Sequence, residues 1–181
     1  MTEKIGSAQK AVIVVDMQND NVGRYCRDII PNIKLLIQKA REKGIPIIFV
    51  CDSRYPEDFL FTRLGHPVST IRGTEGAKVI AELDPRPTDV IIEKRMISGF
   101  FQSDLDFTLR QKGSKLLIVT GVSTGGCVLK TVMDAHELGY ETIVPQDCCA
   151  SPSLESHEWG LKYFERSKML KQTVKEVIET L

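Results

Sequence analysis

Residues 115–128 read KLLIVTGVSTGGCV, in which an apolar run breaks into a turn of small residues and then reaches a cysteine. The run at 116–119 is short and partly β-branched, which is typical of a buried strand. The segment 127–138 is predicted to be a helix, so Cys127 is expected in its first turn. A strand-to-helix turn is where an α/β protein presents groups to a ligand. Because the N-terminus of a helix carries the positive end of its dipole, this position favours the thiolate of Cys127.

Apolar runs alternate with helical patterns along the rest of the chain. Residues 54–74 contain two prolines and two glycines and are expected to form a long loop over one end of the sheet. The alternation predicts an α/β protein whose parallel sheet is covered by helices on both faces. Strands are expected at 11–15, 46–51, 90–92, 115–120 and 141–144, and helices at 29–43, 76–83, 104–112 and 127–138, with 159–181 mostly helical in two pieces.

The composition places the chain among ordinary globular proteins. Its 181 residues are expected to form one domain over 1–181, and a hydrophobic fraction of 42% is sufficient for a sizeable core. The 24 basic residues balance the 24 acidic ones, so no basic surplus indicates binding to nucleic acid. The polar N-terminus has neither a signal-peptide layout nor a membrane span, and five cysteines without framework spacing are expected to be reduced. We therefore expect a cytoplasmic protein that binds neither nucleic acid nor a membrane.

Four polar residues follow the predicted strands: Asp16, Asp52, Lys94 and Cys127. Because the C-terminal ends of parallel strands meet at one edge of a sheet, these side chains are expected to lie together. Cys127 is suited to act as a nucleophile, Asp16 as the base that takes the thiol proton, and Lys94 as a stabilising cation. The backbone amides of residues 123–127 are placed to stabilise the oxyanion that forms when a thiolate attacks a carbonyl.

Each of these residues also has an ordinary structural interpretation. A cysteine at a helix start is more often a small buried residue than a nucleophile. An aspartate that ends a strand is often a turn residue, and a lysine there is often a solvated charge. On the pattern alone, the catalytic and the structural interpretations have about equal weight.

Three motifs resemble the signatures of the isochorismatase-like cysteine hydrolases: VIVVDMQND at 12–20, IIEKRMISGF at 91–100 and VTGVSTGGCV at 119–128. IRGTEGAKV at 71–79 is similar to a further family segment. The resemblance implies a Rossmann-like three-layer α/β/α sandwich with a mostly parallel sheet of about six strands.

The same resemblance implies roles for particular residues. Asp16, Lys94 and Cys127 become the catalytic triad, the Val122–Ser123 peptide bond is expected to be cis, and the amides of Ser123 and Cys127 are expected to form the oxyanion hole. The motifs also contain the candidates for substrate binding, which are Gln18, Phe100 and Thr124.

The resemblance also bears on a metal cofactor. Metal-binding nicotinamidases of this family carry an Asp-x-His pair after the second strand and another histidine further on. Here Asp52 is followed by Arg54 instead of histidine, and the third position corresponds to Ser69. A single carboxylate is a poor site for zinc, so no cofactor is expected, although Asp52 is an isolated candidate ligand and His66 lies close by in sequence.

The turn STGGCV most resembles the N-carbamoylsarcosine amidase branch, while Asn21 departs from the phenylalanine usual at its position. The sequence thus predicts a cysteine-dependent amidohydrolase that cleaves the C–N bond of a small amide or N-carbamoyl compound through a thioacyl intermediate. The alternatives are a nicotinamidase-type amidase and a non-catalytic binding scaffold of the same fold. The resemblance further implies a homo-oligomer, either a dimer or a tetramer.

Overall fold

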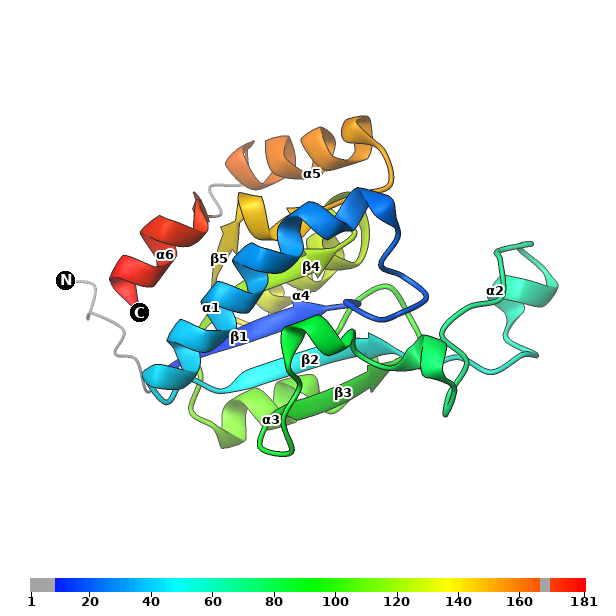
Figure 1. Ribbon diagram of the computed structural model, residues 1–181, viewed down its shortest axis with the longest axis horizontal. Helices are drawn as coiled ribbons and strands as arrows, with labels where there is room; N and C mark the ends of the chain where they lie inside the picture. The colour runs from blue at the N-terminus through cyan, green and yellow to red at the C-terminus, as the bar shows by residue number, and fades with distance from the viewer. Residues whose placement is uncertain (1–8, 167–169) are drawn as a thin grey trace.

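Seven strands form one parallel sheet in the part of the chain that the computed structural model describes, residues 9–166 and 170–181 (Figure 1). Six of them lie in the order β3-β2-β1-β4-β5-β7, and the short β6 pairs with β4. The expected parallel α/β sheet is therefore confirmed. The strands are β1 (Lys10–Val15), β2 (Ile47–Asp52), β3 (Val90–Lys94), β4 (Leu116–Val122), β5 (Glu141–Pro145), β6 (Cys149–Ala150) and β7 (Leu170–Gln172).

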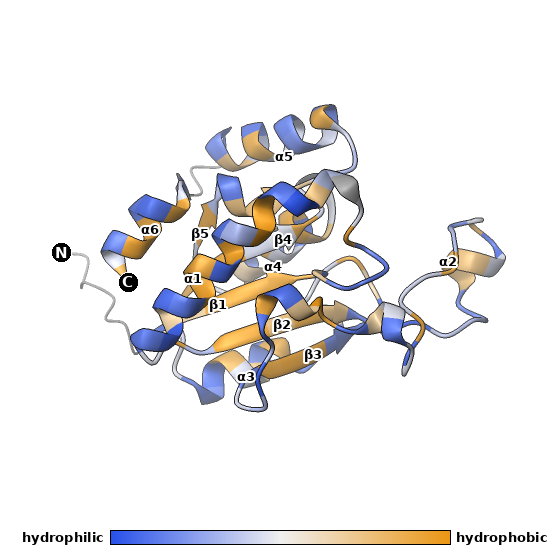
Figure 2. Ribbon diagram, in the orientation of Figure 1, coloured by the Kyte–Doolittle hydropathy of each residue, from blue (hydrophilic) through white to orange (hydrophobic). Residues whose placement is uncertain are grey.

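The central strands are buried along their whole length. Every residue of β1 and β4 is buried, as expected for parallel strands covered on both faces, and β1 is strongly apolar in Figure 2. The register aligns the C-terminal ends, because Val15 pairs with Val50 on one side and with Gly121 on the other. Asp52 pairs with Lys94 at the end of the next ladder. The polar residues that follow these strands consequently lie at one edge of the sheet.

Helices cover both faces of the sheet (Figure 1). Helices α1 (Ile30–Glu42) and α6 (Val174–Thr180) contribute to the core on one face. Helices α3 (Leu105–Gln111), α4 (Leu129–Glu137) and α5 (Leu154–Arg166) contribute to the core on the other. This arrangement is the three-layer sandwich that the sequence predicts.

The prediction of a helix at 76–83 is wrong. Two short 3-10 turns, Glu75–Ala77 and Ala81–Leu83, flank an extended segment instead. The Ile80 amide donates to the carbonyl of Met17, and the carbonyl of Lys78 accepts from Asn19. These contacts with the loop after β1 use the backbone groups that a continuous helix would need.

Two further boundaries differ from the prediction. Helix α5 begins at Leu154, and the three-residue β7 separates it from α6, so 159–181 is not simply helical. The helix expected from 127 starts at Leu129, after a turn at Thr124–Val128.

The expected loop at 54–74 is irregular apart from the one-turn helix α2 (Phe59–Thr62), which extends beyond the C-terminal ends of the strands (Figure 1). Among the described residues, no helix combines the length and the apolar character needed to cross a membrane.

Candidate active site

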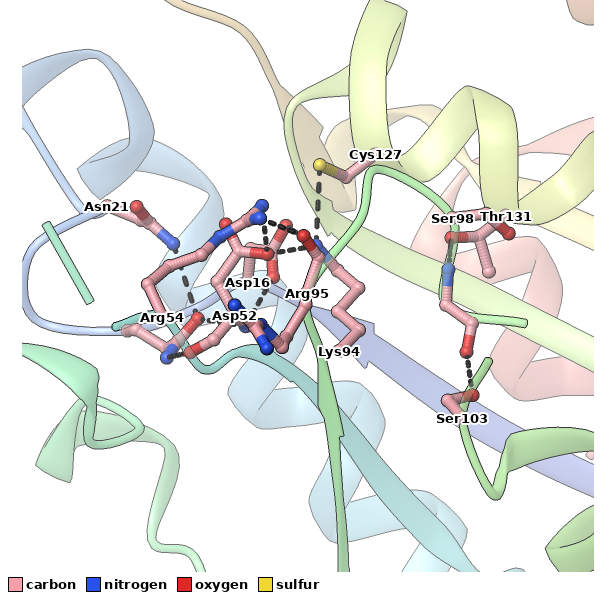
Figure 3. Close-up of polar contacts among 12 residues, drawn as sticks. Asp16, Asn21, Asp52, Arg54, Lys94, Arg95, Ser98, Ser103, Cys127 and Thr131 are labelled. Atoms are coloured by element: carbon pink, nitrogen blue, oxygen red, sulfur yellow. Dashed lines mark hydrogen bonds and ion pairs between the residues drawn. The ribbon is translucent and has the colours of Figure 1, made fainter. Parts of the chain in front are cut away.

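The amino group of Lys94 is the centre of a buried cluster at the C-terminal edge of the sheet (Figure 3). Its Nζ lies 2.9 Å from Oδ2 of Asp16 and 2.6 Å from Oδ1 of Asp52. The same nitrogen lies 3.6 Å from Sγ of Cys127. The structure thus brings together the four polar residues that the sequence places at the strand ends.

Asp16 occupies a backbone conformation that few residues with side chains adopt. It is the first residue after β1 and has a φ of 52°. Such conformations concentrate at functional sites. Its Oδ1 accepts a hydrogen bond from the Asp52 amide at 3.1 Å, which fixes the carboxylate between β1 and β2.

Burial raises the pKa of Asp16 to about 6, Lys94 opposes that shift, and the charge of Asp52 adds to it. At neutral pH Asp16 is therefore an ionised carboxylate with a pKa suited to accepting and returning a proton. The pKa of Lys94 is raised despite its burial, because Asp16, Cys127 and Asp52 favour its charged form. Lys94 is thus a permanent cation at the centre of the site.

The environment of Cys127 differs from the expected helix start. Burial raises the pKa of its thiol well above the usual range, Asp16 raises it further, and Lys94 lowers it. Cys127 also lies in the turn before α4, where Gly126 has the non-helical angles φ −127° and ψ −108°. The expectation that Cys127 lies in the first turn of the helix is therefore wrong, and burial opposes the thiolate that this position was expected to favour. The thiol is protonated at rest and needs a neighbouring base, which is the position that Asp16 occupies.

Residues Thr124–Val128 form what we call the nucleophile turn. It follows a cis peptide bond between Val122 and Ser123, as the family resemblance implies. The amides of Gly126 and Val128 both donate to the carbonyl of Ser123, at 3.0 Å and 3.1 Å. These bonds curl the backbone tightly around Ser123. The oxyanion role of the Ser123 and Cys127 amides stays a prediction.

The three residues predicted to bind substrate have partners inside the protein. Gln18 is fully buried, and its Nε2 donates to the carbonyls of Asp52 and Ala77 at 2.8 Å and 2.7 Å. Its Oε1 accepts from the Asp52 amide at 2.8 Å. Gln18 therefore fixes the end of β2, and its expected contact with the substrate stays a prediction.

Phe100 and Thr124 also have partners inside the protein, and their expected contacts with the substrate stay predictions. Phe100 stacks on Tyr140 with the ring centroids 5.8 Å apart and packs against the core beneath α3 and α4. Thr124 is fully buried, and its hydroxyl lies 2.8 Å from Nδ1 of His157. Sequence reasoning missed this role of His157, because nothing in the local pattern relates it to a turn more than 30 residues away.

Arg54 is the second residue whose role the sequence did not reveal. It is almost fully buried, and its guanidinium donates to the carbonyl of Arg95 and, at 3.1 Å, to Oδ1 of Asp52. In the sequence, only its position two residues after the strand-end Asp52 indicated that Arg54 could lie near the site. Asp52 is thus a shared counterion of two cations, an arrangement that does not suit a metal ligand.

A cavity of about 310 Å³ lies beside Asp52 and Arg54, under the loop at 54–74. His66 and Ser69 also line it, and a second, mainly apolar cavity of about 540 Å³ lies along Gly125 and Gly126. Within 9–166 and 170–181, no three His, Cys, Asp or Glu side chains gather as metal ligands. The expectation that the protein uses no cofactor stays a prediction.

Comparison with known proteins identifies a family and several relatives that this chain resembles. A family model described as the isochorismatase domain matches residues 10–180. A ureidoacrylate amidohydrolase of Variovorax paradoxus is 32% identical over 185 residues, which cover 85% of this chain and 71% of the relative. The solved nicotinamidase of Bacillus subtilis has a TM-score of 0.83 and 30% identity, covering 91% of this chain and 99% of its own. The N-carbamoylsarcosine amidase of Thermoplasma acidophilum has a TM-score of 0.82 and 28% identity, covering 92% and 96%. The three names indicate three different substrates.

Proposed function

The chain belongs to the isochorismatase domain family, and from that premise we propose that it is a cysteine-dependent amidohydrolase that cleaves the C–N bond of a small amide or N-carbamoyl compound. One observation carries this proposal: Nζ of Lys94 contacts Oδ2 of Asp16 at 2.9 Å and Sγ of Cys127 at 3.6 Å. A base, a cation and a thiol within contact of one another are the parts that nucleophilic catalysis requires.

The first half of the reaction forms a covalent intermediate. Asp16 takes the thiol proton of Cys127, and the sulfur attacks the substrate carbonyl carbon. The carbonyl oxygen becomes an oxyanion that the amides of Ser123 and Cys127 stabilise. Asp16 then returns the proton to the leaving nitrogen, the C–N bond breaks, and an amine or ammonia departs from a thioester or thiocarbamate.

The second half regenerates the thiol. Asp16, again ionised, accepts a proton from a water molecule that attacks the thioacyl carbon. The C–S bond breaks, the acid or carbamate leaves, and the proton passes from Asp16 to the sulfur. Lys94 remains charged throughout and stabilises whichever of Asp16 and Cys127 is anionic at each stage.

The nucleophile turn supports an N-carbamoyl compound as the substrate. Together with the preceding Ser123, its sequence STGGCV resembles that of the N-carbamoylsarcosine amidase branch, and one solved relative carries that name. Arg54, bonded to Asp52 where the resemblance places a histidine in metal-binding nicotinamidases, supports a reaction without a metal. The predicted homo-oligomer and the cytoplasmic location are separate predictions.

The test is release of ammonia from a panel of N-carbamoylsarcosine, ureidoacrylate and nicotinamide. We expect turnover of at least one N-carbamoyl compound and none in the Cys127→Ala variant. Cys26→Ala is the matched control, since Cys26 is buried in the opposite core layer and its variant should retain activity. Full activity in Cys127→Ala would refute the mechanism, and turnover of nicotinamide alone would favour the nicotinamidase alternative.

A further inference from the structure

Helix α5 packs backbone against backbone on the nucleophile turn. Gly160, in the middle of α5, is buried, and a Cβ added there would lie 2.9 Å from the Thr124 carbonyl oxygen and 3.0 Å from the Gly125 nitrogen. A Cβ added at Gly125 would in turn lie 2.5 Å from the Ser156 carbonyl oxygen. The two glycines therefore allow a separation that side chains would forbid.

A side-chain hydrogen bond crosses the same contact. The Thr124 hydroxyl lies 2.8 Å from Nδ1 of His157, which is in the first turn of α5. Thr124 is fully buried, and His157 is half-buried. Burial lowers the pKa of His157, so the imidazole is neutral near pH 7, and its tautomer decides whether Nδ1 accepts from the Thr124 hydroxyl or donates to it.

The turn is also fixed from its other side. The amide of Gly125 donates to Oγ of Ser151 at 3.3 Å, and the same hydroxyl donates to Oγ of Ser123 at 3.3 Å. Ser151 and His157 thus bracket the Thr124–Gly125 peptide between them. The glycine contacts set how near α5 lies, whereas these hydrogen bonds set the orientation of the turn.

We propose that His157 is a positioning residue for the hydrolysis, holding Thr124 so that the nucleophile turn presents the Ser123 and Cys127 amides to the developing oxyanion. The inference rests on the proposed function. His157 touches Thr124 rather than the triad, so it acts through the turn. Because an oxyanion hole requires donors at about 2.7–3.1 Å from the oxyanion, a small rotation of the turn weakens the transition state more than substrate binding.

The main test compares two reactions of Cys127 in single-turnover experiments. Acylation by p-nitrophenyl acetate forms the S–C bond at a carbonyl, passes through an oxyanion and expels p-nitrophenolate, while Asp16 takes the thiol proton. Alkylation by iodoacetamide forms an S–C bond at a CH₂ group and expels iodide, with no oxyanion. In His157→Ala we expect acylation to slow about tenfold and alkylation to stay within about twofold of the unmodified protein.

Conservative variants of His157 distinguish the effect of its hydrogen bond to Thr124 from the effect of its packing. In His157→Asn the side-chain amide can place a polar atom where Nδ1 lies, and we expect acylation to recover. His157→Gln places its amide one bond further out, so acylation should remain slow. His136→Ala is the matched control, since His136 is exposed on α4, and it should leave both reactions unchanged.

Amide turnover gives an independent readout. For the best substrate of the panel, His157→Ala should lower kcat about tenfold and leave KM within about twofold. Unchanged acylation in His157→Ala would overturn the inference, and so would equal slowing of acylation and alkylation, which indicates a general structural role. If the unmodified protein hydrolyses no amide, the proposed function fails, and the acylation comparison still decides the role of His157.

Discussion

Arg54 donates through Nη2 to Oδ1 of Asp52 at 3.1 Å, the same oxygen that accepts from Nζ of Lys94 at 2.6 Å (Figure 3). One carboxylate is therefore the shared counterion of two cations that are both almost fully buried. Asp52 pairs with both Arg54 and Lys94, whereas Asp16 is the second carboxylate that pairs with Lys94. Arg54 thereby affects the charge balance of the triad without touching Cys127.

Removing that guanidinium is expected to destabilise the fold. Arg54→Leu leaves the Arg95 carbonyl without its donor and leaves Asp52 with one cation fewer, which we expect to lower the free energy of unfolding by about 3 kcal/mol. Urea denaturation measures this change. Lys39→Ala, which breaks an exposed pair with Glu42, is the control and should shift the midpoint far less. Equal shifts in the two variants would show that the Arg54 pair is no stronger than a surface pair.

The raised pKa of Asp16 predicts an acid limb in the pH profile. Only the ionised carboxylate accepts the thiol proton, so kcat/KM should fall about tenfold per pH unit below an apparent pKa of about 6. Stability depends on pH in the opposite direction. Because the pKa of Asp16 is about 6 in the folded protein and its ordinary value is 3.8, the free energy of unfolding falls as the pH rises from about 4 to 6. An acid limb centred near pH 4 would contradict Asp16 as the base.

Asp16→Asn is expected to separate hydrolysis from thiol reactivity. The charge of Asp16 raises the pKa of the Cys127 thiol, whereas Lys94 lowers it. The variant should lose amide turnover for lack of a base, and yet its thiol should ionise at lower pH. Iodoacetamide alkylation at pH 8 should therefore be faster than in the unmodified protein. Slower alkylation would mean that Asp16 promotes thiolate formation more than its charge opposes it.

Metal removal is expected to leave activity unchanged. Oδ1 of Asp52 accepts from both Lys94 and Arg54, so the strand-end carboxylate is already compensated. Dialysis against EDTA, followed by the ammonia assay and elemental analysis, measures this. Loss of activity that added zinc restores would contradict the expectation, and it would direct attention to the cavity that His66 and Ser69 line.

Gly160→Ala tests the close contact between α5 and the nucleophile turn. Alanine is the better helix former by about 1 kcal/mol, so an exposed position would gain stability. Here the new Cβ would lie 2.9 Å from the Thr124 carbonyl oxygen, and we expect a lower melting temperature together with slower turnover. Glu158→Ala, at an exposed site of the same helix, is the control and should lose neither. A more stable Gly160→Ala would show that α5 can shift without cost.

The placement of the triad was predictable because it follows from local sequence and one topological rule. Asp16 and Lys94 end or follow apolar runs, and parallel strands bring such ends to one edge. The nucleophile turn was less predictable. Gly125 and Gly126 permit a turn that moves the start of α4 to Leu129. Hydrophobic periodicity does not indicate this shift in the helix boundary.

The features that were hardest to predict depend on distant partners or on very short elements. Gln18 bonds to the backbone of Asp52, Phe100 stacks on Tyr140, and neither partner is close in sequence. Strand β7 has three residues, too few for an alternating pattern to appear. Local sequence therefore indicated which residues are chemically capable, while tertiary contacts decide which of them hold the others in place.

The packing of α5 on the nucleophile turn also sets an order of events during synthesis. The ribosome adds Asp16, Lys94 and Cys127 before it begins α5, and Gly160 and His157 contact the turn only afterwards. A nascent chain thus carries every residue of the proposed triad before it carries the helix that packs on the nucleophile turn. On the proposed mechanism, the contacts that hold the nucleophile turn therefore form only after the nucleophile itself has been synthesised.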